Sequence, residues 1–161
     1  QGRGASREQT ITILEEAGAD LSRVIFGHSD RIAWDMPLML ELLGHGVYIQ
    51  FDMLGIDTAP LLLYPKSHSR QDIRGLALTP HAVEAIPRLI EKGYEDRILL
   101  SQDVCMKMQL KSYGGNGYSF VLESVLPELR RRGVTEEQSR KLMVDNPARV
   151  LTFVERSSTP P

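Results

Sequence analysis

Residues 24–30 read VIFGHSD, an apolar run that ends at a glycine and passes directly into polar residues. Residues 47–52 and 98–103, VYIQFD and ILLSQD, repeat this arrangement later in the chain. Each apolar run is too short for a helix and is bounded by polar residues or glycine, which is typical of a strand. Because the runs contain almost no polar side chains, we expect strands covered on both faces, as in a parallel sheet. The predicted strands are residues 24–26, 47–51 and 98–100.

Helical patterns occupy the stretches before, between and after these strands. Their starts are indicated by capping residues and by proline in a first turn. The five predicted helices begin at Ser6, Asp35, Thr79, Tyr118 and Thr135. The residues expected to share the buried face of the first helix are Thr10, Ile13, Leu14 and Ala17. Pro87 and Pro127 fall inside two of the helices, where an interior proline costs about 3 kcal/mol, so we expect a bend or a break at each.

The alternation of helices and strands predicts an α/β fold with parallel strands joined by right-handed crossovers. Either an open doubly wound sheet or part of a closed (β/α)₈ TIM barrel fits this order. A complete barrel is excluded, because about 250 residues are typical for that fold, whereas this chain has 161. We expect one folded unit over residues 1–156, with a long loop at 53–78 and a disordered tail at 157–161.

The composition argues against several classes of protein. Hydrophobic residues make up 42% of the chain and charged residues 25%, which is ordinary for a globular domain. No segment approaches the roughly 20 apolar residues of a membrane span, and the net charge of −2 argues against a nucleic-acid partner. We therefore expect a soluble, cytoplasmic protein. The single cysteine, Cys105, cannot form an internal disulfide, so a bound metal would need histidine and carboxylate ligands.

Polar side chains follow each predicted strand: His28 after the first, Asp52 after the second and Asp103 after the third. The carboxyl ends of parallel strands face one crevice, so we expect these side chains to converge. Imidazole and carboxylate are ligands for Zn²⁺ and similar divalent ions, and a further carboxylate can accept a proton. The spacing alone also allows His28 to be an ordinary loop residue, and Asp30 and Asp103 to be helix caps or turn residues. Two ligands are also fewer than a catalytic zinc site usually has.

Two further features are weaker candidates. Cys105 lies close to Asp103, but no histidine is near it in the sequence, so a thiolate nucleophile is a poor explanation. Residues 113–118, YGGNGY, could cradle an anion, but they lack the Lys and Ser/Thr of a phosphate-binding P-loop. A tight turn explains their glycines more simply.

Five segments, taken in order, resemble the C-terminal half of the phosphotriesterase-like family of the amidohydrolase superfamily. They are residues 23–31, 46–52, 98–105, 113–118 and 145–149. The resemblance implies a (β/α)₈ barrel whose sixth, seventh and eighth strands lie in this chain, so a partial barrel replaces the open sheet as the expected fold. It also implies a binuclear site for divalent metal, expected to be zinc, at the carboxyl ends of the strands. Residues 104–119, which include Cys105, resemble the loop after the eighth strand.

The resemblance also implies roles for individual residues. His28 matches the metal-binding histidine of the sixth strand. Asp103 matches the aspartate of the eighth strand, which binds metal and takes a proton during catalysis. Met53 stands where relatives often carry a basic residue that faces the substrate, so substrate preference cannot be transferred. We expect Asp30 and Asp52 to hydrogen-bond to His28 or to the loops and so to support the site.

The family's remaining metal ligands lie on strands that precede the region this chain resembles. At most two of the six usual ligands are therefore present, and we expect the polypeptide alone to have little or no turnover. Three strands would also leave the inward face of a barrel without partners. The side chains expected on that face are Val24, Phe26, Ile49 and Leu99. We therefore predict self-association, partial order, or dependence on a missing half.

These inferences lead to two hypotheses about function. In the first, the chain is the C-terminal part of a metal-dependent hydrolase that acts on a small molecule with a phosphotriester, lactone or related ester bond. In the second, it is a non-catalytic fragment or pseudoenzyme that binds a small molecule or a partner chain.

Overall fold

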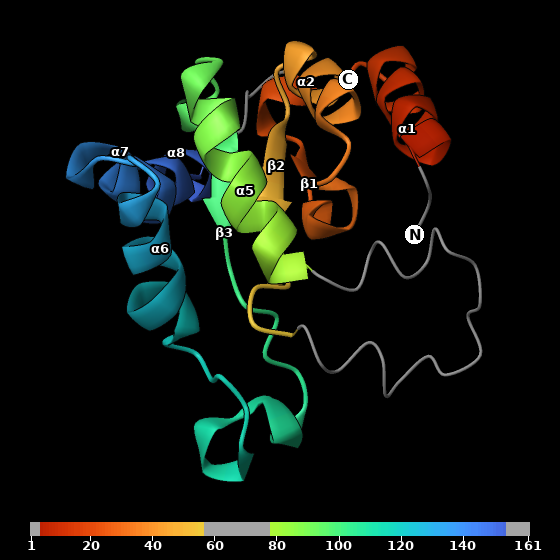
Figure 1. Ribbon diagram of the computed structural model, residues 1–161. Coiled ribbons are helices and arrows are strands. Elements are labelled where there is room, and N and C mark those ends of the chain that lie inside the picture. The colour runs from red at the N-terminus through yellow and green to blue at the C-terminus, as the bar shows by residue number, and fades with distance from the viewer. Residues whose placement is uncertain (1–3, 57–77, 154–161) are drawn as a thin grey trace.

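The computed structural model describes residues 4–56 and 78–153, and these contain a three-stranded parallel sheet. The strands are β1 (Ile25–Phe26), β2 (Tyr48–Phe51) and β3 (Ile98–Leu100), in the order β1-β2-β3 (Figure 1). Residue 25 pairs with residue 48, and residue 49 pairs with residue 98. All three predicted strands and their parallel direction are confirmed. The predicted tail and most of the predicted long loop lie outside the described residues.

Helices account for the rest of the regular structure, in agreement with the predicted α/β class. The α-helices are α1 (Gly4–Glu16), α2 (Met36–Gly44), α5 (Leu78–Glu91), α6 (Leu126–Arg131), α7 (Glu136–Arg140) and α8 (Asn146–Leu151). Two π-helical turns, η6 (Val121–Val125) and η7 (Lys141–Asp145), lead into α6 and α8. The 3-10 turns are η1 (Leu21–Arg23), η2 (Ser29–Ile32), η3 (Glu95–Arg97), η4 (Lys107–Gln109) and η5 (Lys111–Tyr113). Across residues 4–56 and 78–153, no helix is long and apolar enough to cross a membrane.

Two helix starts follow directly from local capping chemistry. The Asp35 side chain accepts a hydrogen bond at 3.2 Å from a backbone N–H in the first turn of α2, which fixes the start predicted there. Thr135 and Gln138 form the predicted capping box at the start of α7. By contrast, α1 begins at Gly4, two residues before the predicted start at Ser6.

Two other predicted starts are displaced. Thr79 lies inside α5 rather than before it, and its hydroxyl accepts a hydrogen bond from the Gly55 N–H at 2.8 Å. The hydroxyl therefore ties α5 to the segment that follows β2. The regular helix predicted from Tyr118 begins later, with the π-helical turn η6. Pro127 is the second residue of α6, and α6 continues from η6 without interruption, so the chain does not break at this proline.

The buried face of α1 differs from the predicted one. Ile11 is 2% exposed, whereas Ile13 is 64% exposed. Arg7 and Leu14 are partly buried, so the inward face follows positions 7, 11 and 14, a spacing that lies on one side of a helix. Of the predicted face, Leu14 is partly buried, whereas Thr10, Ile13 and Ala17 are exposed. Adjacent apolar residues in this segment allow two stripes, and contacts with the rest of the fold select between them.

Pro87 lies inside α5, and the helix is continuous from Leu78 to Glu91, so of the two predicted outcomes, a bend or a break, the break does not occur. Proline removes a single backbone hydrogen bond and crowds the preceding turn. Val83, Ile86 and Leu89 bury one side of this helix in the core. Because tertiary packing supplies most of a helix's stability in a folded protein, this burial outweighs the local cost of the proline.

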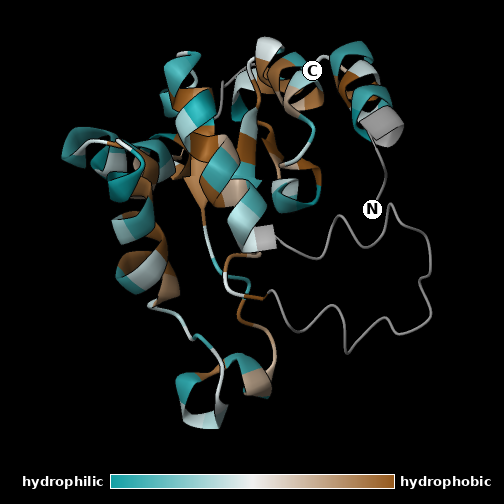
Figure 2. Ribbon diagram, in the orientation of Figure 1, coloured by the Kyte–Doolittle hydropathy of each residue, from teal (hydrophilic) through white to brown (hydrophobic). Residues whose placement is uncertain are grey.

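The main core lies between the sheet and the helices α2, α5 and α6. Ile49, Phe51 and Ile98 are fully buried in it, together with Met39 and Leu89 on the facing helices. Figure 1 shows α5 running across the sheet, and Figure 2 shows hydrophobic residues concentrated where strands and helices meet. This packing holds the carboxyl ends of the strands in fixed positions.

The opposite face of the sheet is partly covered by α8. Tyr48 and Leu99 pack there against Val150, and Leu99 is only 5% exposed. Three side chains that were predicted to face this side pack instead against the helix-facing core: Val24, Phe26 and Ile49. The prediction of four inward side chains without partners is therefore wrong, because side chains alternate along a strand and the register was not known. On this face, Ile25 of β1 is 37% exposed.

Candidate active site

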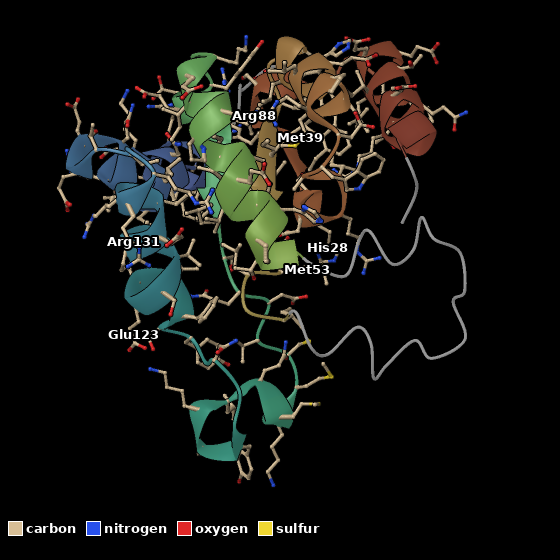
Figure 3. All side chains as sticks on the ribbon, viewed as in Figure 1. His28, Met39, Met53, Arg88, Glu123 and Arg131 are labelled. Atoms are coloured by element: carbon tan, nitrogen blue, oxygen red, sulfur yellow. The ribbon has the colours of Figure 1, made fainter. Side chains whose placement is uncertain are left out.

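The candidate residues lie at the carboxyl ends of the three strands. His28 follows β1, Asp52 and Met53 follow β2, and Asp103 follows β3. Because the strands are adjacent and parallel, these segments lie at one edge of the sheet. Figure 3 shows His28 and Met53 at this edge, near the end of α5 at which that helix begins.

Asp52 fixes the orientation of the His28 ring. Its Oδ1 lies 2.8 Å from His28 Nδ1 and 2.9 Å from the backbone nitrogen of the same residue. A carboxylate oxygen accepts hydrogen bonds, so Nδ1 is the donor in this contact, and in the neutral ring Nε2 keeps a free lone pair. Carboxylates orient metal-binding histidines in this way. The His28 side chain is 28% exposed, so its ring remains accessible from outside.

His28 and Asp103 share an unusual backbone conformation. Their φ angles are 52° and 47°, and within residues 4–56 and 78–153 no other non-glycine residue has a positive φ. The left-handed region is costly for L-residues, although Asn, Asp and His enter it more readily than most. Such conformations persist where surrounding contacts impose them, and they cluster at active sites. The two residues predicted as metal ligands therefore sit in turns that the rest of the structure must hold.

Asp30 supports the end of β2 from a fully buried position. Its Oδ2 accepts hydrogen bonds from the backbone N–H groups of Asp52 and Met53, at 2.9 and 3.2 Å. Burial raises the pKa of the Asp30 carboxyl to about 7, with a further rise from the Asp52 charge that backbone hydrogen bonds oppose. Its Oδ1 has no hydrogen-bond partner among the described residues. Asp30 lies within the turn η2, but its side chain accepts from the two residues that follow β2, so it connects the carboxyl ends of β1 and β2.

Arg7, on α1, is a site residue that sequence reasoning missed. Its guanidinium donates hydrogen bonds to the carbonyl oxygens of Gly27 and His28, at 3.1 and 3.0 Å, and to Ser29 Oγ at 3.1 Å. Burial lowers the pKa of Arg7 from its ordinary value, whereas the charge of Asp52 raises it. The one signal in the sequence is the position of Arg7 on the inward face of α1, and nothing local indicates its partners.

Gln109 is a second residue that sequence reasoning missed, and it holds the segment after β3. Its buried Oε1 accepts hydrogen bonds from the N–H groups of Cys105 and Met106, at 2.8 and 2.6 Å, and its Nε2 donates to the Asp103 carbonyl at 3.2 Å. Asp103 and Cys105 are exposed. Within the described part of the chain, no hydrogen bond or ion pair joins the Asp103 carboxylate to the residues around His28. Asp103 and His28 therefore share an edge without touching.

Met53 does not face open solvent. Its side chain is buried and packs with Ile56 and Met106 in a small apolar cluster beneath the edge of the sheet. At this position, where the family resemblance leads us to expect a side chain that faces the substrate, the chain therefore has an apolar packing residue.

The residues at this edge have the chemistry of metal ligands but are few. Among the described residues, no group of three His, Cys, Asp or Glu side chains is placed to hold a metal ion. His28 fits one ligand position through its free Nε2, and Asp103 offers a carboxylate at the same edge. A catalytic zinc site usually has three protein ligands, so these two residues do not make such a site by themselves.

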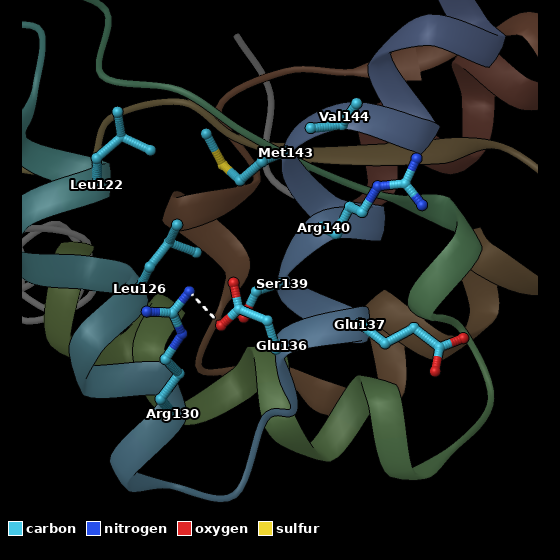
Figure 4. Close-up of a pocket in the computed structure, with 9 residues that line it drawn as sticks. All are labelled: Leu122, Leu126, Arg130, Glu136, Glu137, Ser139, Arg140, Met143 and Val144. Carbon is cyan, nitrogen blue, oxygen red and sulfur yellow. Dashed lines mark ion pairs between the residues drawn. The ribbon is translucent and has the colours of Figure 1, made fainter.

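A groove of about 500 Å³ lies elsewhere, among η6, α6, α7 and η7 (Figure 4). It is lined by apolar side chains such as Leu126 and Met143, and the Arg130–Glu136 ion pair, at 2.6 Å, lies beside it. None of the candidate residues lines this groove, so it is separate from the edge of the sheet described above.

Comparisons with known sequences give consistent matches over nearly the whole chain. The sequence model of the phosphotriesterase family matches residues 2–151. The N-acetyltaurine hydrolase of Tetraodon nigroviridis is 36% identical over 149 residues, which cover 92% of this chain and 41% of that protein. The N-acetyltaurine hydrolase of Homo sapiens is 37% identical over 145 residues, which cover 90% of this chain and 40% of that protein.

Solved structures match the fold as well. A resiniferatoxin-binding protein from Rhodobacter sphaeroides superposes with a TM-score of 0.76 at 37% identity, over 89% of this chain and 38% of the other. The phosphotriesterase from Mycobacterium tuberculosis gives a TM-score of 0.70 at 28% identity, over 89% and 41%. The chain spans about two fifths of the length of these relatives. Since the family model covers almost every residue, this chain belongs to the phosphotriesterase family.

Proposed function

We propose that this chain supplies the sixth, seventh and eighth strands of a (β/α)₈ barrel, together with part of a metal-dependent hydrolytic site. The observation that carries the proposal is the pairing of His28 Nδ1 with Asp52 at 2.8 Å, which leaves Nε2 free at the carboxyl edge of the sheet. Membership of the phosphotriesterase family over residues 2–151 supports the hydrolytic chemistry.

The cofactor that suits these side chains is a divalent metal, and imidazole with carboxylate favours zinc. When bound, the metal polarises the phosphoryl or carbonyl oxygen of the substrate. His28 holds it through Nε2, Asp52 fixes the His28 ring, and Asp30 fixes the backbone at Asp52. The Asp103 carboxylate contributes a second ligand and accepts a proton from the attacking water.

His28 and Asp103 are too few to complete such a site. We therefore propose that the remaining ligands come from residues outside this chain, in keeping with its coverage of about two fifths of the curated relatives. The 161-residue polypeptide is then expected to hydrolyse little substrate by itself, and the unsatisfied edges of the sheet favour self-association.

The proposed substrates are small molecules with a phosphotriester, lactone or related ester bond. The similarity to N-acetyltaurine hydrolases, at up to 37% identity, adds N-acyl amides as a second class. Both classes present a polarised oxygen next to the bond that water cleaves, so the same arrangement of ligands and proton acceptor suits either.

The test is Asp103→Asn in the enzyme expressed from its natural gene. Hydrolysis of a chromogenic phosphotriester, a lactone and an N-acetyl amide is expected to fall to background, while part of the bound metal is retained. Asp20→Asn is the matched control, because Asp20 caps η1 from an exposed position and asparagine caps equally well. Unchanged turnover in Asp103→Asn contradicts the assignment. An unmodified enzyme with neither metal nor hydrolysis favours the non-catalytic hypothesis.

A further inference from the structure

The turn that presents His28 lacks a local explanation. His28 has a φ of 52° and precedes η2, but its side chain makes no capping hydrogen bond to that turn. Histidine enters the left-handed region more readily than most residues, but the conformation is still costly for an L-residue. Something outside the turn must therefore select this conformation.

Arg7 reaches the turn from α1 and contacts each of its residues. One guanidinium nitrogen donates to the carbonyl oxygens of Gly27 (3.1 Å) and His28 (3.0 Å), and the other donates to Ser29 Oγ (3.1 Å). Ser29 Oγ in turn donates to the Phe26 carbonyl at 2.8 Å. The turn is therefore tied both to α1 and to the last residue of β1.

The position of Arg7 is itself fixed by packing. Ile11, one helical turn further along α1, is buried in the main core, and the Arg7 Cζ lies 5.7 Å from the centre of the Phe26 ring. Asp52 and Asp30 attract the guanidinium charge, while Arg31 repels it. Burial, ring contact and charge all hold Arg7 over the residues that precede and follow His28.

We propose that Arg7 is a positioning residue for His28. By holding the carbonyl oxygens of Gly27 and His28, it keeps the His28 Nδ1–H on Asp52 and so leaves Nε2 as the free nitrogen. The structural part of this inference stands by itself, whereas its effect on hydrolysis rests on the proposed function. The planar guanidinium of arginine can donate to several acceptors at once, whereas lysine has a single ammonium group, so lysine should replace Arg7 only in part.

The test reads the protonation of the His28 ring directly. Protein labelled with ¹⁵N-histidine is studied by long-range ¹H–¹⁵N correlation spectroscopy, and His28→Gln identifies the His28 signals among the four histidines. The neutral form of wild-type His28 is expected to carry its proton on Nδ1, which faces Asp52. Arg7→Ala is expected to give a mixture of the two tautomers, and Arg7→Lys an intermediate mixture. Arg131→Ala, an exposed arginine paired with Glu128, is expected to leave the His28 signals unchanged.

The outcome that overturns the inference is a folded Arg7→Ala protein whose His28 signals match those of the wild type. If Arg7→Ala does not fold, Ser29→Ala provides the second test, because it removes one of the three acceptors and leaves α1 intact. That variant is expected to shift the tautomer in the same direction by a smaller amount, and an unchanged tautomer also overturns the inference.

Activity separates this inference from the proposed function. In the enzyme from the natural gene, Arg7→Ala is expected to lower kcat/KM about 10- to 100-fold, the range found when residues that orient metal ligands are removed. If His28→Ala leaves hydrolysis unchanged, the proposed function fails whatever the tautomer shows. If His28→Ala abolishes hydrolysis while Arg7→Ala changes neither the tautomer nor kcat/KM, the positioning role alone fails.

Discussion

Asp30→Asn should remove a pH dependence of stability that the wild-type protein shows between pH 4 and 8. Burial raises the pKa of the Asp30 carboxyl from 3.8 to about 7, so the folded protein binds this proton more tightly than the unfolded chain. The stabilising effect is complete below pH 3.8 and is lost as pH rises through 7. At 1.36 kcal/mol for each pKa unit, the loss is about 4 kcal/mol.

This loss of about 4 kcal/mol is a large fraction of the roughly 5–15 kcal/mol by which a domain of this kind is stable. Asparagine is neutral at every pH, and its carbonyl can accept the same hydrogen bonds from Asp52 and Met53. Urea denaturation of the metal-free wild type and of Asp30→Asn, at intervals from pH 4 to 8, gives the two free energies of unfolding. The wild-type value minus the variant value should fall by about 4 kcal/mol over this range.

The other titratable groups are present in both proteins, and their effects on the free energy of unfolding largely cancel in the difference. Asp20→Asn serves as the control, because Asp20 is exposed and its pKa is lowered by hydrogen bonds from Ser22. If the difference in the free energy of unfolding between wild type and Asp30→Asn stays constant from pH 4 to 8, the conclusion that the Asp30 carboxyl is neutral in the folded state is refuted.

Three further substitutions probe the site and the fold. Asp52→Ala should weaken metal binding about 10- to 100-fold in a chelator competition, because the His28 ring loses the carboxylate that orients it; unchanged affinity contradicts this role. Gly115→Ala should lower the free energy of unfolding in urea by about 1–3 kcal/mol, since a Cβ there would overlap the Gln109 backbone; a neutral effect would show that the loop can move aside. Thr135→Ala should lower the free energy of thermal unfolding by about 1 kcal/mol, because it removes the capping box. Thr135→Ser should keep most of the wild-type stability, because serine can form the same cap.

The elements whose signals are local were predictable from the sequence. The three strands stood out because apolar runs of this length, bounded by polar residues, fit few alternatives. The starts at Asp35 and Thr135 were predictable because the caps bond to N–H groups within the same turn. The placement of His28, Asp52 and Asp103 at one edge followed from parallel strands in sequential order.

What the sequence could not provide were contacts between distant segments. Asp30 looked like a turn residue, yet its partners Asp52 and Met53 are 22 and 23 positions away. Arg7 donates hydrogen bonds to residues 20 to 22 positions away. No local sequence pattern predicts which distant oxygen atoms an arginine will bind. The faces of α1 and of the strands were also misassigned, because helix contacts and sheet register decide which apolar stripe is buried.

The most direct test of the candidate site is the metal content of the protein expressed from its natural gene, measured by plasma mass spectrometry after extensive dialysis. The wild type should retain divalent metal, and His28→Ala should lose at least part of it. His45→Ala, which removes an exposed imidazole at the end of α2, should retain the wild-type amount. Metal retained equally by wild type and His28→Ala would contradict the assignment of this edge of the sheet as a metal site.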